Sequence, residues 1–483
     1  MSHAQQSHAL FIDNDARQPM AGDSLPVVDP STGHTFARIA RGSALDVDVA
    51  VTSARAAFEL HWSATPAVER GRLLRRLGDL VEANAEALAV IESQDTGKPL
   101  RQARADATAL ARYFEFYAGA ADKLHGQTIP YQAGYTVMTL REPHGVTGHI
   151  VPWNYPMQIF GRSVGASLAA GNACVVKPAE DACLSVLKVA ELAAQAGFPP
   201  GVLNVVTGLG PEAGQALTEH EGIDHLSFTG SPETGRRVAE AAARRHCPVT
   251  LELGGKSPQV VFADADLDAA LPVLVNAIIQ NCGQTCSAGS RLLVERGIAD
   301  RVVELLAVRF ATLRAGPARD DLDLGPLVTR KQQQRVWDYL SDAQSAGLTF
   351  AAQGSVADHA PADGFYQAPV MLTGVGPAQR LFQEEIFGPV LVVTPFEDEA
   401  DAIRLANGTP FGLVAGVWTR DGARQFRMAR ALRCGQVFVN NYGAGGGVEL
   451  PFGGVKHSGH GREKGFEALY AFTTLKTVAV RHG

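Results

Sequence analysis

The chain has little of several features that mark specialised classes of protein. Its 483 residues include six scattered cysteines, no run of lysine and arginine, and no apolar stretch of the roughly 18 to 20 residues that a membrane helix needs. So few cysteines exclude a disulfide framework and a zinc ribbon, and no metal site is predicted. The net charge of −7 provides no electrostatic footprint for nucleic acid or for an anionic membrane. We therefore expect a small molecule as the partner.

The composition is typical of a globular α/β protein. Hydrophobic residues make up 46% and charged residues 19%, with 50 glycines and 26 prolines. The length predicts two or three lobes, at roughly 100 to 200 residues each. The first twenty residues are polar and lack the regions of a secretory signal, so we expect a cytoplasmic protein.

Hydrophobic periodicity predicts the order of the elements. Apolar residues recur at helical spacing over residues 46–124. After an extended stretch, short β-rich runs alternate with helical patterns, which predicts a parallel sheet covered on both faces. The predicted strands are 146–151, 173–177, 202–207, 225–229 and 249–253, with helices at 184–196 and 232–245. A second α/β set follows, with helices at 266–280 and 298–315 and strands near 391–395 and 435–440.

Two segments, 134–141 and 471–481, alternate like strands outside these lobes. Such strands can add to the sheet of a partner subunit, which predicts a homodimer or homotetramer. The alternative interpretation is an ordinary edge strand.

Three segments carry side chains suited to carbonyl chemistry. Cys286 lies in a small, polar, glycine-flanked loop where a thiol can act as a nucleophile, although a lone cysteine is often a buried hydrophobe. Glu252 ends a predicted strand among apolar neighbours, where it is either a general base with a raised pKa or one half of a salt bridge. Asn154, between two prolines, can donate to an oxyanion from a rigid turn, or it belongs to a simple loop.

Together with further segments, these motifs resemble the aldehyde dehydrogenase superfamily, and in particular its betaine-aldehyde and semialdehyde dehydrogenases. The resemblance runs through almost the whole chain, and the further segments are 177–180, 228–231, 384–389 and 451–454. It implies a non-acylating, NAD(P)-dependent enzyme that oxidises an aldehyde to the carboxylic acid. It also implies an α/β fold with three parts: a Rossmann-type parallel-sheet cofactor domain (1–124 and 143–253), an α/β catalytic domain (254–465) and a small β oligomerisation arm (125–142 and 466–483).

The resemblance implies a role for each catalytic residue. Cys286 attacks the aldehyde carbon, and the oxyanion takes hydrogen bonds from Asn154 and from the Cys286 backbone N–H. Hydride leaves for the nicotinamide, and Glu252 activates the water that releases the acid from the thioester. Glu463 matches a second carboxylate that the family uses in proton relay, with a structural ion pair as the alternative.

For the cofactor, the resemblance implies that residues 228–231 open a helix whose N–H groups face the pyrophosphate. Lys177 and Glu180 match positions at the adenosine ribose, where a carboxylate accepts hydroxyl hydrogen bonds and repels a 2′-phosphate. This favours NAD, with NADP as the alternative because Lys177 can pair with that phosphate. The complete implied set is Val151, Pro152, Trp153, Lys177, Ala179, Glu180, Gly210, Pro211, Phe228, Thr229, Gly230, Ser231, Thr234, Leu253, Gly254, Glu385 and Phe387.

The implied substrate residues are Tyr155, Ile159, Arg162, Thr285, Ser287, Glu449 and Phe452. Semialdehyde-oxidising members carry Arg at the position of Arg162, which favours an anionic aldehyde. Gln280 stands where those enzymes have a second Arg, however, and Arg162 and Glu449 can pair with each other instead. The glycine-rich run 443–447 would open the funnel to a bulky or aromatic aldehyde. Ser163 replaces a Lys that is common in the family.

Three further interpretations remain open at this stage. An acylating enzyme would pass the thioester to coenzyme A, although Glu252, as a base aimed at water, argues against it. A catalytically silent member would keep the fold alone. Cys282 can form a disulfide with Cys286 under oxidation, or it is a buried inert thiol.

Overall fold

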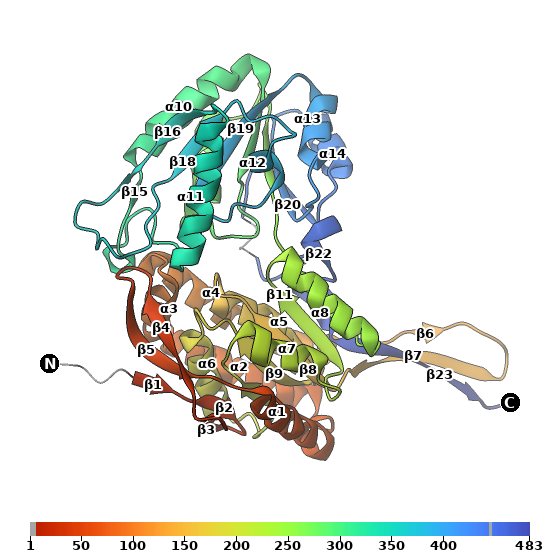
Figure 1. Ribbon diagram of the computed structural model, residues 1–483. Helices are drawn as coiled ribbons and strands as arrows, with labels where there is room; N and C mark the ends of the chain where they lie inside the picture. Colours follow the sequence, from red (N-terminus) through yellow and green to blue (C-terminus); the bar gives the residue numbers. More distant parts are fainter. Residues whose placement is uncertain (1–5, 444–446) are drawn as a thin grey trace.

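The protein consists of two α/β lobes and a projecting β arm (Figure 1). The computed structural model describes residues 6–443 and 447–483. The first lobe, drawn from red to lime, contains the N-terminal helices and the first sheet; the second, drawn from green to blue, contains the second sheet. Within the described ranges, no helix is both long and apolar enough to cross a membrane.

The helical region predicted over residues 46–124 is confirmed. It consists of α1 (Ala44–Ala57), α2 (Ala67–Ala83), α3 (Ala85–Thr96) and α4 (Leu100–Ala120). The five strands before it were not predicted: β1 (Gln6–His8), β2 (Leu10–Ile12), β3 (Asp15–Arg17), β4 (Ser24–Asp29) and β5 (His34–Ala40). Three of these strands have only three residues each, too few to show an alternating pattern.

The first sheet has eight strands in the order β22-β12-β11-β8-β9-β10-β2-β3. Its parallel centre contains all five predicted strands: β8 (Val146–Val151), β9 (Ala173–Pro178), β10 (Leu203–Val205), β11 (His225–Thr229) and β12 (Val249–Glu252). The antiparallel strands β2, β3 and β22 (Gly459–His460) complete the edges.

Hydrophobic cores cover both faces of this sheet, as predicted. Along β9, Cys174 and Val176 belong to one core cluster, whereas Ala173 and Val175 belong to another. Successive strand residues point to opposite faces, so residues 173–176 are all apolar because both faces are buried. The covering helices include α5 (Pro156–Ala170), α6 (Leu184–Gln195), α7 (Gln215–Glu219) and α8 (Pro232–Arg244).

The second sheet has seven strands in the order β16-β18-β19-β14-β13-β20-β21, parallel except for β16. The strands are β13 (Pro258–Val261), β14 (Arg291–Glu295), β16 (Thr349–Gln353), β18 (Val370–Thr373), β19 (Val390–Phe396), β20 (Val414–Trp418) and β21 (Gln436–Val439). Its helices include α9 (Leu267–Ile279), α10 (Ala299–Thr312), α11 (Arg330–Ser345), α13 (Glu399–Asn407) and α14 (Gly422–Ala431). Strand β12 ends at Glu252 and β13 begins at Pro258, so the chain crosses directly from the carboxyl edge of the first sheet to the amino edge of the second.

The arm is a three-stranded antiparallel sheet in the order β23-β7-β6. Its strands are β6 (Thr128–Ile129), β7 (Tyr135–Pro143) and β23 (Thr473–Arg481), and β7 pairs with β23 along its whole length. The two segments predicted as strands outside the lobes therefore pair with each other. In Figure 1 the arm extends well beyond the two lobes.

Three histidines meet at the root of the arm. The ring of His144 stacks on that of His225 at 4.8 Å, and Phe472, which precedes β23, contacts both His225 and His149. Burial lowers the pKa of all three histidines, that of His149 to about 3. The folded protein therefore keeps these side chains neutral.

Acidification is expected to destabilise the wild type more than a His149→Gln variant. Unfolded histidine binds protons below its ordinary pKa of 6.5, whereas folded His149 stays neutral down to about 3. The neutral His149 side chain thus contributes fully to the free energy of unfolding above pH 6.5. This contribution decreases as the pH falls below 6.5, and the loss is roughly 2 kcal/mol at pH 5. Urea unfolding of both proteins at pH 7.5 and 5.0 measures the difference, since the other buried groups titrate alike in both. An equal loss of stability in the two proteins would contradict this account.

Candidate active site

The residues assigned to the cofactor gather at one edge of the first sheet. Val151 ends β8, Lys177 lies at the end of β9, Thr229 ends β11, and Leu253 follows β12. Because these four strands are parallel neighbours, their carboxyl ends lie side by side, where ligands bind in open α/β sheets.

Helix α8 begins at this edge. Ser231 is its N-cap, and the Ser231 hydroxyl accepts a hydrogen bond from the Thr234 backbone N–H at 3.3 Å. The Gly230 N–H donates to the Glu252 carbonyl at 3.0 Å, which fixes the turn between β11 and the helix. The N-terminus of this 13-residue helix presents backbone N–H groups and the positive end of its dipole, a suitable place for a phosphate.

Lys177 and Glu180 form an ion pair beside this edge. The ammonium lies 2.7 Å from one carboxylate oxygen of Glu180, and the Gly210 N–H donates to the other oxygen at 3.3 Å. Burial raises the pKa of Glu180, but Lys177 and the backbone donors outweigh it and hold the pKa below its ordinary value. Gly210 and Pro211 open the short turn of residues 210–214 that completes this corner.

Residues of the second lobe close the site from the other side. The Glu385 carboxylate accepts a hydrogen bond from the Gly255 N–H at 2.9 Å, and a Cβ on Gly254 would lie only 2.3 Å from its second oxygen. Burial raises the pKa of Glu385 to about 7. The rings of Trp153 and Phe387 meet edge to face at 5.3 Å across the two lobes.

A sharp turn between α9 and β14 carries Cys286. Asn281, Cys282 and Gly283 have left-handed φ angles of 48°, 55° and 72°. Only glycine fits the third position, because a Cβ there would lie 2.2 Å from the Gly388 carbonyl oxygen.

Asn154 is hydrogen-bonded to this turn. Its side-chain amide donates to the Gln284 carbonyl at 3.1 Å, and the Asn281 amide donates to the Asn154 carbonyl at 2.8 Å. The oxyanion candidate and the nucleophile candidate are thus held together, although they are far apart in the sequence.

Cys286 packs among apolar side chains of the second lobe, including Leu413, Val414 and Phe452. Burial raises the pKa of its thiol to about 12, and the Arg162 guanidinium opposes this shift. Cys282 belongs to a different core cluster, and both cysteines are free thiols. The structure therefore agrees with a buried thiol at Cys282 and contains no disulfide to Cys286.

Glu252 is 1% exposed, and neither of its carboxylate oxygens has a hydrogen-bond partner among the described residues. Burial, together with the nearby Glu463 carboxylate, raises its pKa well above the ordinary value, while Arg162 acts in the opposite direction. The salt bridge that sequence offered as an alternative is not found at this carboxyl. A buried, unpartnered carboxyl at a strand end is suited to proton transfer.

The pairing of Arg162 with Glu449 is wrong. Arg162 forms a buried ion pair with Glu463, and Glu449 instead pairs with the exposed Arg112 at 2.5 Å. Glu463 reaches α5 because its backbone forms a β-bridge with Phe452. The structural ion pair considered for Glu463 is therefore present.

The other substrate candidates lie around the same turn. The Tyr155 hydroxyl bonds to the Thr285 hydroxyl at 2.9 Å and accepts from the Gln280 amide at 3.1 Å, and the Tyr442 hydroxyl donates to the Ser287 carbonyl. Ile159 is buried in the first-lobe core. Residues 444–446 of the glycine-rich run lie outside the described residues.

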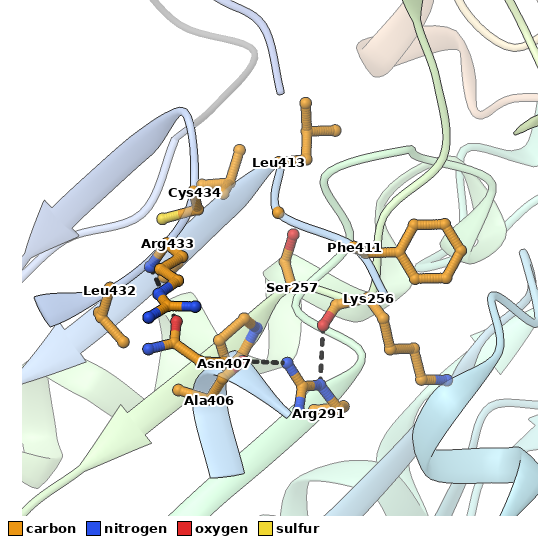
Figure 2. A pocket seen from close by; sticks show the side chains of 14 residues that line it. Lys256, Ser257, Arg291, Ala406, Asn407, Phe411, Leu413, Leu432, Arg433 and Cys434 are labelled. Atoms are coloured by element: carbon orange, nitrogen blue, oxygen red, sulfur yellow. Dashed lines mark hydrogen bonds between the residues drawn. The ribbon is translucent and has the colours of Figure 1, made fainter. Parts of the chain in front are cut away.

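Sequence reasoning missed two buried cations: Lys256, within the loop of residues 254–258, and Arg291, which lies next to it (Figure 2). The Arg291 guanidinium donates to the carbonyls of Lys256, Leu405 and Ala406 at 2.7 to 2.8 Å. Burial lowers the pKa of Arg291 to about 9 and that of Lys256 to about 7. The apolar run 292–294 after Arg291 was the available signal that this arginine starts a buried strand. In the described part of the chain, no group of three or more His, Cys, Asp or Glu could hold a metal ion.

This fold and site define a two-lobed enzyme in which the carboxyl edge of a nucleotide-binding type of sheet faces a half-buried cysteine. The model of the aldehyde dehydrogenase family matches residues 18–478, and the chain belongs to this family of NAD(P)-dependent oxidoreductases. The predicted family, fold class and NAD(P) dependence are confirmed.

Known proteins are similar over nearly the full length. The hydroxyisobutyraldehyde dehydrogenase of Mycolicibacterium austroafricanum is 43% identical over 98% of this chain and 93% of its own. A crystal structure from Burkholderia cenocepacia, described as an aldehyde dehydrogenase, is 70% identical with a TM-score of 0.98, covering 98% of this chain and 100% of that one. The NAD+ complex of an aldehyde dehydrogenase from Bacillus cereus is 40% identical with a TM-score of 0.96, covering 99% and 97%.

Proposed function

We propose that the protein oxidises an aldehyde to the carboxylic acid through a thioester on Cys286, which Glu252 hydrolyses as general base. The observation that carries this proposal is the buried Glu252 carboxyl close to the half-buried Cys286 thiol at the junction of the lobes. The Glu252 carboxyl has no partner among the described residues, and it interacts electrostatically with the Cys286 thiol.

The residues present fit NAD as the cofactor. The α8 N-terminus suits the pyrophosphate, the Lys177–Glu180 pair the adenosine ribose, and Glu385 the nicotinamide ribose. Gly254 has no side chain, and this leaves room for the Glu385 carboxylate to lie close to the backbone at that position. We favour NAD over NADP, since Lys177 is already neutralised by Glu180. When bound, the cofactor accepts a hydride from the substrate carbon.

The protein side of the reaction follows from three groups. The Cys286 thiol releases its proton to solvent water and its sulfur adds to the carbonyl carbon, which converts the carbonyl oxygen into an oxyanion. Asn154 keeps a second amide hydrogen for that oxyanion, and the Cys286 N–H is its other donor. After the substrate carbon is oxidised, Glu252 takes a proton from water, the water oxygen adds to the thioester, and the carbon–sulfur bond breaks.

The same residues argue against the acylating alternative. A buried carboxyl without a hydrogen-bond partner in the described part of the chain is placed to activate a molecule as small as water. Transfer to coenzyme A instead requires that water be kept from the thioester.

For the substrate, the Arg162–Glu463 pair favours an uncharged aldehyde over an anionic semialdehyde, because the guanidinium already has a buried carboxylate partner. Tyr155, Thr285, Ser287 and Phe452 are the proposed walls of the funnel. The relative that is 43% identical is named a hydroxyisobutyraldehyde dehydrogenase, and this name supports a neutral substrate.

The proposed organisation follows the sequence boundaries. We assign 1–124 and 143–253 to the cofactor domain, 254–465 to the catalytic domain, and 125–142 with 466–483 to an oligomerisation arm. The outer edge of β23 has no partner strand in the described part of the chain, and Leu475 and Val480 are exposed on it. A homodimer or homotetramer would cover this edge.

Replacing Glu252 by Gln is expected to stall the enzyme as a thioester. Mixing with NAD and propanal should still give one NADH per active site in a rapid burst, followed by turnover at least about 100-fold slower than wild type. Stopped-flow absorbance measures the burst, and mass spectrometry locates the propanoyl group on the Cys286 peptide.

Glu240→Gln, which changes an exposed carboxyl on α8, is the matched control and should behave as wild type. Unchanged steady-state turnover in the Glu252→Gln variant would overturn the assignment of the base. Faster NADH formation by the wild type on addition of coenzyme A would instead support acyl transfer.

A further inference from the structure

Arg162 and Glu463 form an ion pair that is almost completely buried. The side chain of Arg162 is 8% exposed and that of Glu463 is 0% exposed. The second carboxylate oxygen of Glu463 accepts a hydrogen bond from the Ser227 hydroxyl at 3.2 Å. Glu463 also exchanges both of its backbone hydrogen bonds with Phe452, at 2.6 and 2.7 Å. The carboxylate is thus fixed from three sides.

The Arg162 guanidinium also has further contacts besides Glu463. It lies over the Phe452 ring, 4.8 Å from the centroid, and reaches the Thr229 hydroxyl at 3.5 Å. Cys286 packs against the apolar cluster to which Phe452 belongs. The guanidinium and the nucleophile candidate therefore both lie next to this cluster.

The next residue on the helix provides no charge that could replace Arg162. Ser163 is 1% exposed, and its hydroxyl donates to the Ile159 carbonyl at 2.9 Å. The Lys464 ammonium lies 5.3 Å from the centroid of the Phe452 ring, and burial lowers the pKa of Lys464 to about 7. A buried cation that remains charged through the working pH range must therefore come from Arg162.

We propose that Arg162 is a positioning residue that holds the Glu463 side chain near Glu252, and that it does not bind the substrate. The inference rests on the proposed function. Two carboxyls in one buried region do not both ionise readily, so the arginine decides which of them carries the proton in the resting enzyme. Because its pKa is raised, Glu252 keeps the proton that it must lose before it can accept one from water.

The charges around this pair determine what each substitution should do. Glu463 raises the pKa of Glu252, whereas Arg162 lowers it and also opposes the raised pKa of Cys286. The titratable and charged groups that interact with the pair or with Glu252 are Glu252, Cys286, Tyr113, Tyr117, Arg462 and Lys464. Removing Arg162 should therefore raise the pKa of Glu252, whereas removing Glu463 should lower it.

The test is the pH dependence of thioester hydrolysis in Arg162→Met and Glu463→Gln. We expect the acid limb of kcat to move up by about one pH unit in Arg162→Met and down by about one unit in Glu463→Gln, with the double variant between them. Arg162→Lys should recover most of the wild-type profile. If both single variants lose activity without opposite shifts, the pair is merely structural and the proposal is wrong.

A second arm tests the substrate. The ratio of kcat/KM for butanal to that for succinic semialdehyde should stay within about threefold between wild type and Arg162→Lys, with butanal preferred. A clamp that binds a substrate carboxylate would lose 10-fold or more for the anionic aldehyde alone, roughly the loss of one charge-assisted hydrogen bond, and this would overturn the proposal. Failure of the proposed function is distinguishable, since the wild type would then form no thioester at any pH.

Discussion

Replacing Cys286 by Ala will abolish aldehyde oxidation. We expect a loss of at least about 10⁴-fold in turnover, because without the sulfur no tetrahedral adduct forms from which the hydride can leave. NADH formation with a neutral aldehyde is the measurement. NAD binding, followed by calorimetry, should be unchanged, since Cys286 packs against apolar side chains of the second lobe and not against the proposed phosphate site.

The matched control is Cys247→Ala. Cys247 is a half-buried free thiol in the turn before β12, and its sulfur lies near the carbonyl oxygens of Ile223 and Pro248, away from the proposed site. Its removal should leave turnover within about twofold of wild type. Turnover by the Cys286→Ala variant at more than a hundredth of the wild-type rate would rule out the thioester mechanism.

Replacing Lys98 by Met will destabilise the fold by about 3 to 5 kcal/mol. The Lys98 ammonium lies 2.9 Å from a Glu92 oxygen and 2.5 Å from an Asp106 oxygen, and all three side chains are at most 4% exposed. Removing the cation leaves two buried carboxyls without their counter-ion. Burial already raises the pKa of Glu92 to about 7, so both acids would have to be protonated or remain as uncompensated charges.

This network also supports the start of α5. Glu92 accepts hydrogen bonds from the Met157 N–H at 3.2 Å and the Ser185 hydroxyl at 3.0 Å, and Lys98 lies over the Tyr155 ring at 4.3 Å. Met157 and Tyr155 lie within three residues of Asn154. Loss of Lys98 should therefore lower kcat as well as stability.

Urea unfolding measures the free energy of unfolding for Lys98→Met and for the control Lys188→Met. Lys188 also forms an ion pair, with Glu191 at 2.8 Å, but both side chains are exposed by a third or more. Exposed pairs contribute about 0 to 1 kcal/mol, so the control should barely differ from wild type. Equal effects in the two variants would show that burial of the Lys98 network does not govern its energy.

The strands at the centre of the first sheet were predictable because they are buried on both faces. Residues 146–151 and 225–229 contain no Asp, Glu, Lys or Arg and are rich in β-branched and aromatic residues, and their observed bounds agree with the prediction. The three-residue strands β1, β2 and β3 were not predictable, since they obtain their stability from neighbours that are distant in sequence.

The candidate site shows the same division. Cys286, Glu252 and Asn154 became candidates from their own short segments, because a reachable thiol, an acid at a strand end and an amide between prolines each depend on local sequence, and the family resemblance implied their roles. The partner of Arg162 was not recognisable. Glu449 and Glu463 are both acidic and both C-terminal to the funnel, and only the β-bridge from Phe452 to Glu463 brings one of them beneath α5.

By itself, the sequence determined the class of fold, the family and the chemical types of the groups at the junction of the lobes, because hydrophobic period and short motifs are local properties. Only the tertiary structure decided which charges are buried and with whom they pair. Lys98 and Arg291 look like surface residues in sequence, and Arg162 looks like a substrate ligand, but each is a buried cation in the fold. The physical reason is that burial and ion pairing depend on contacts across tens to hundreds of residues, which no local pattern encodes.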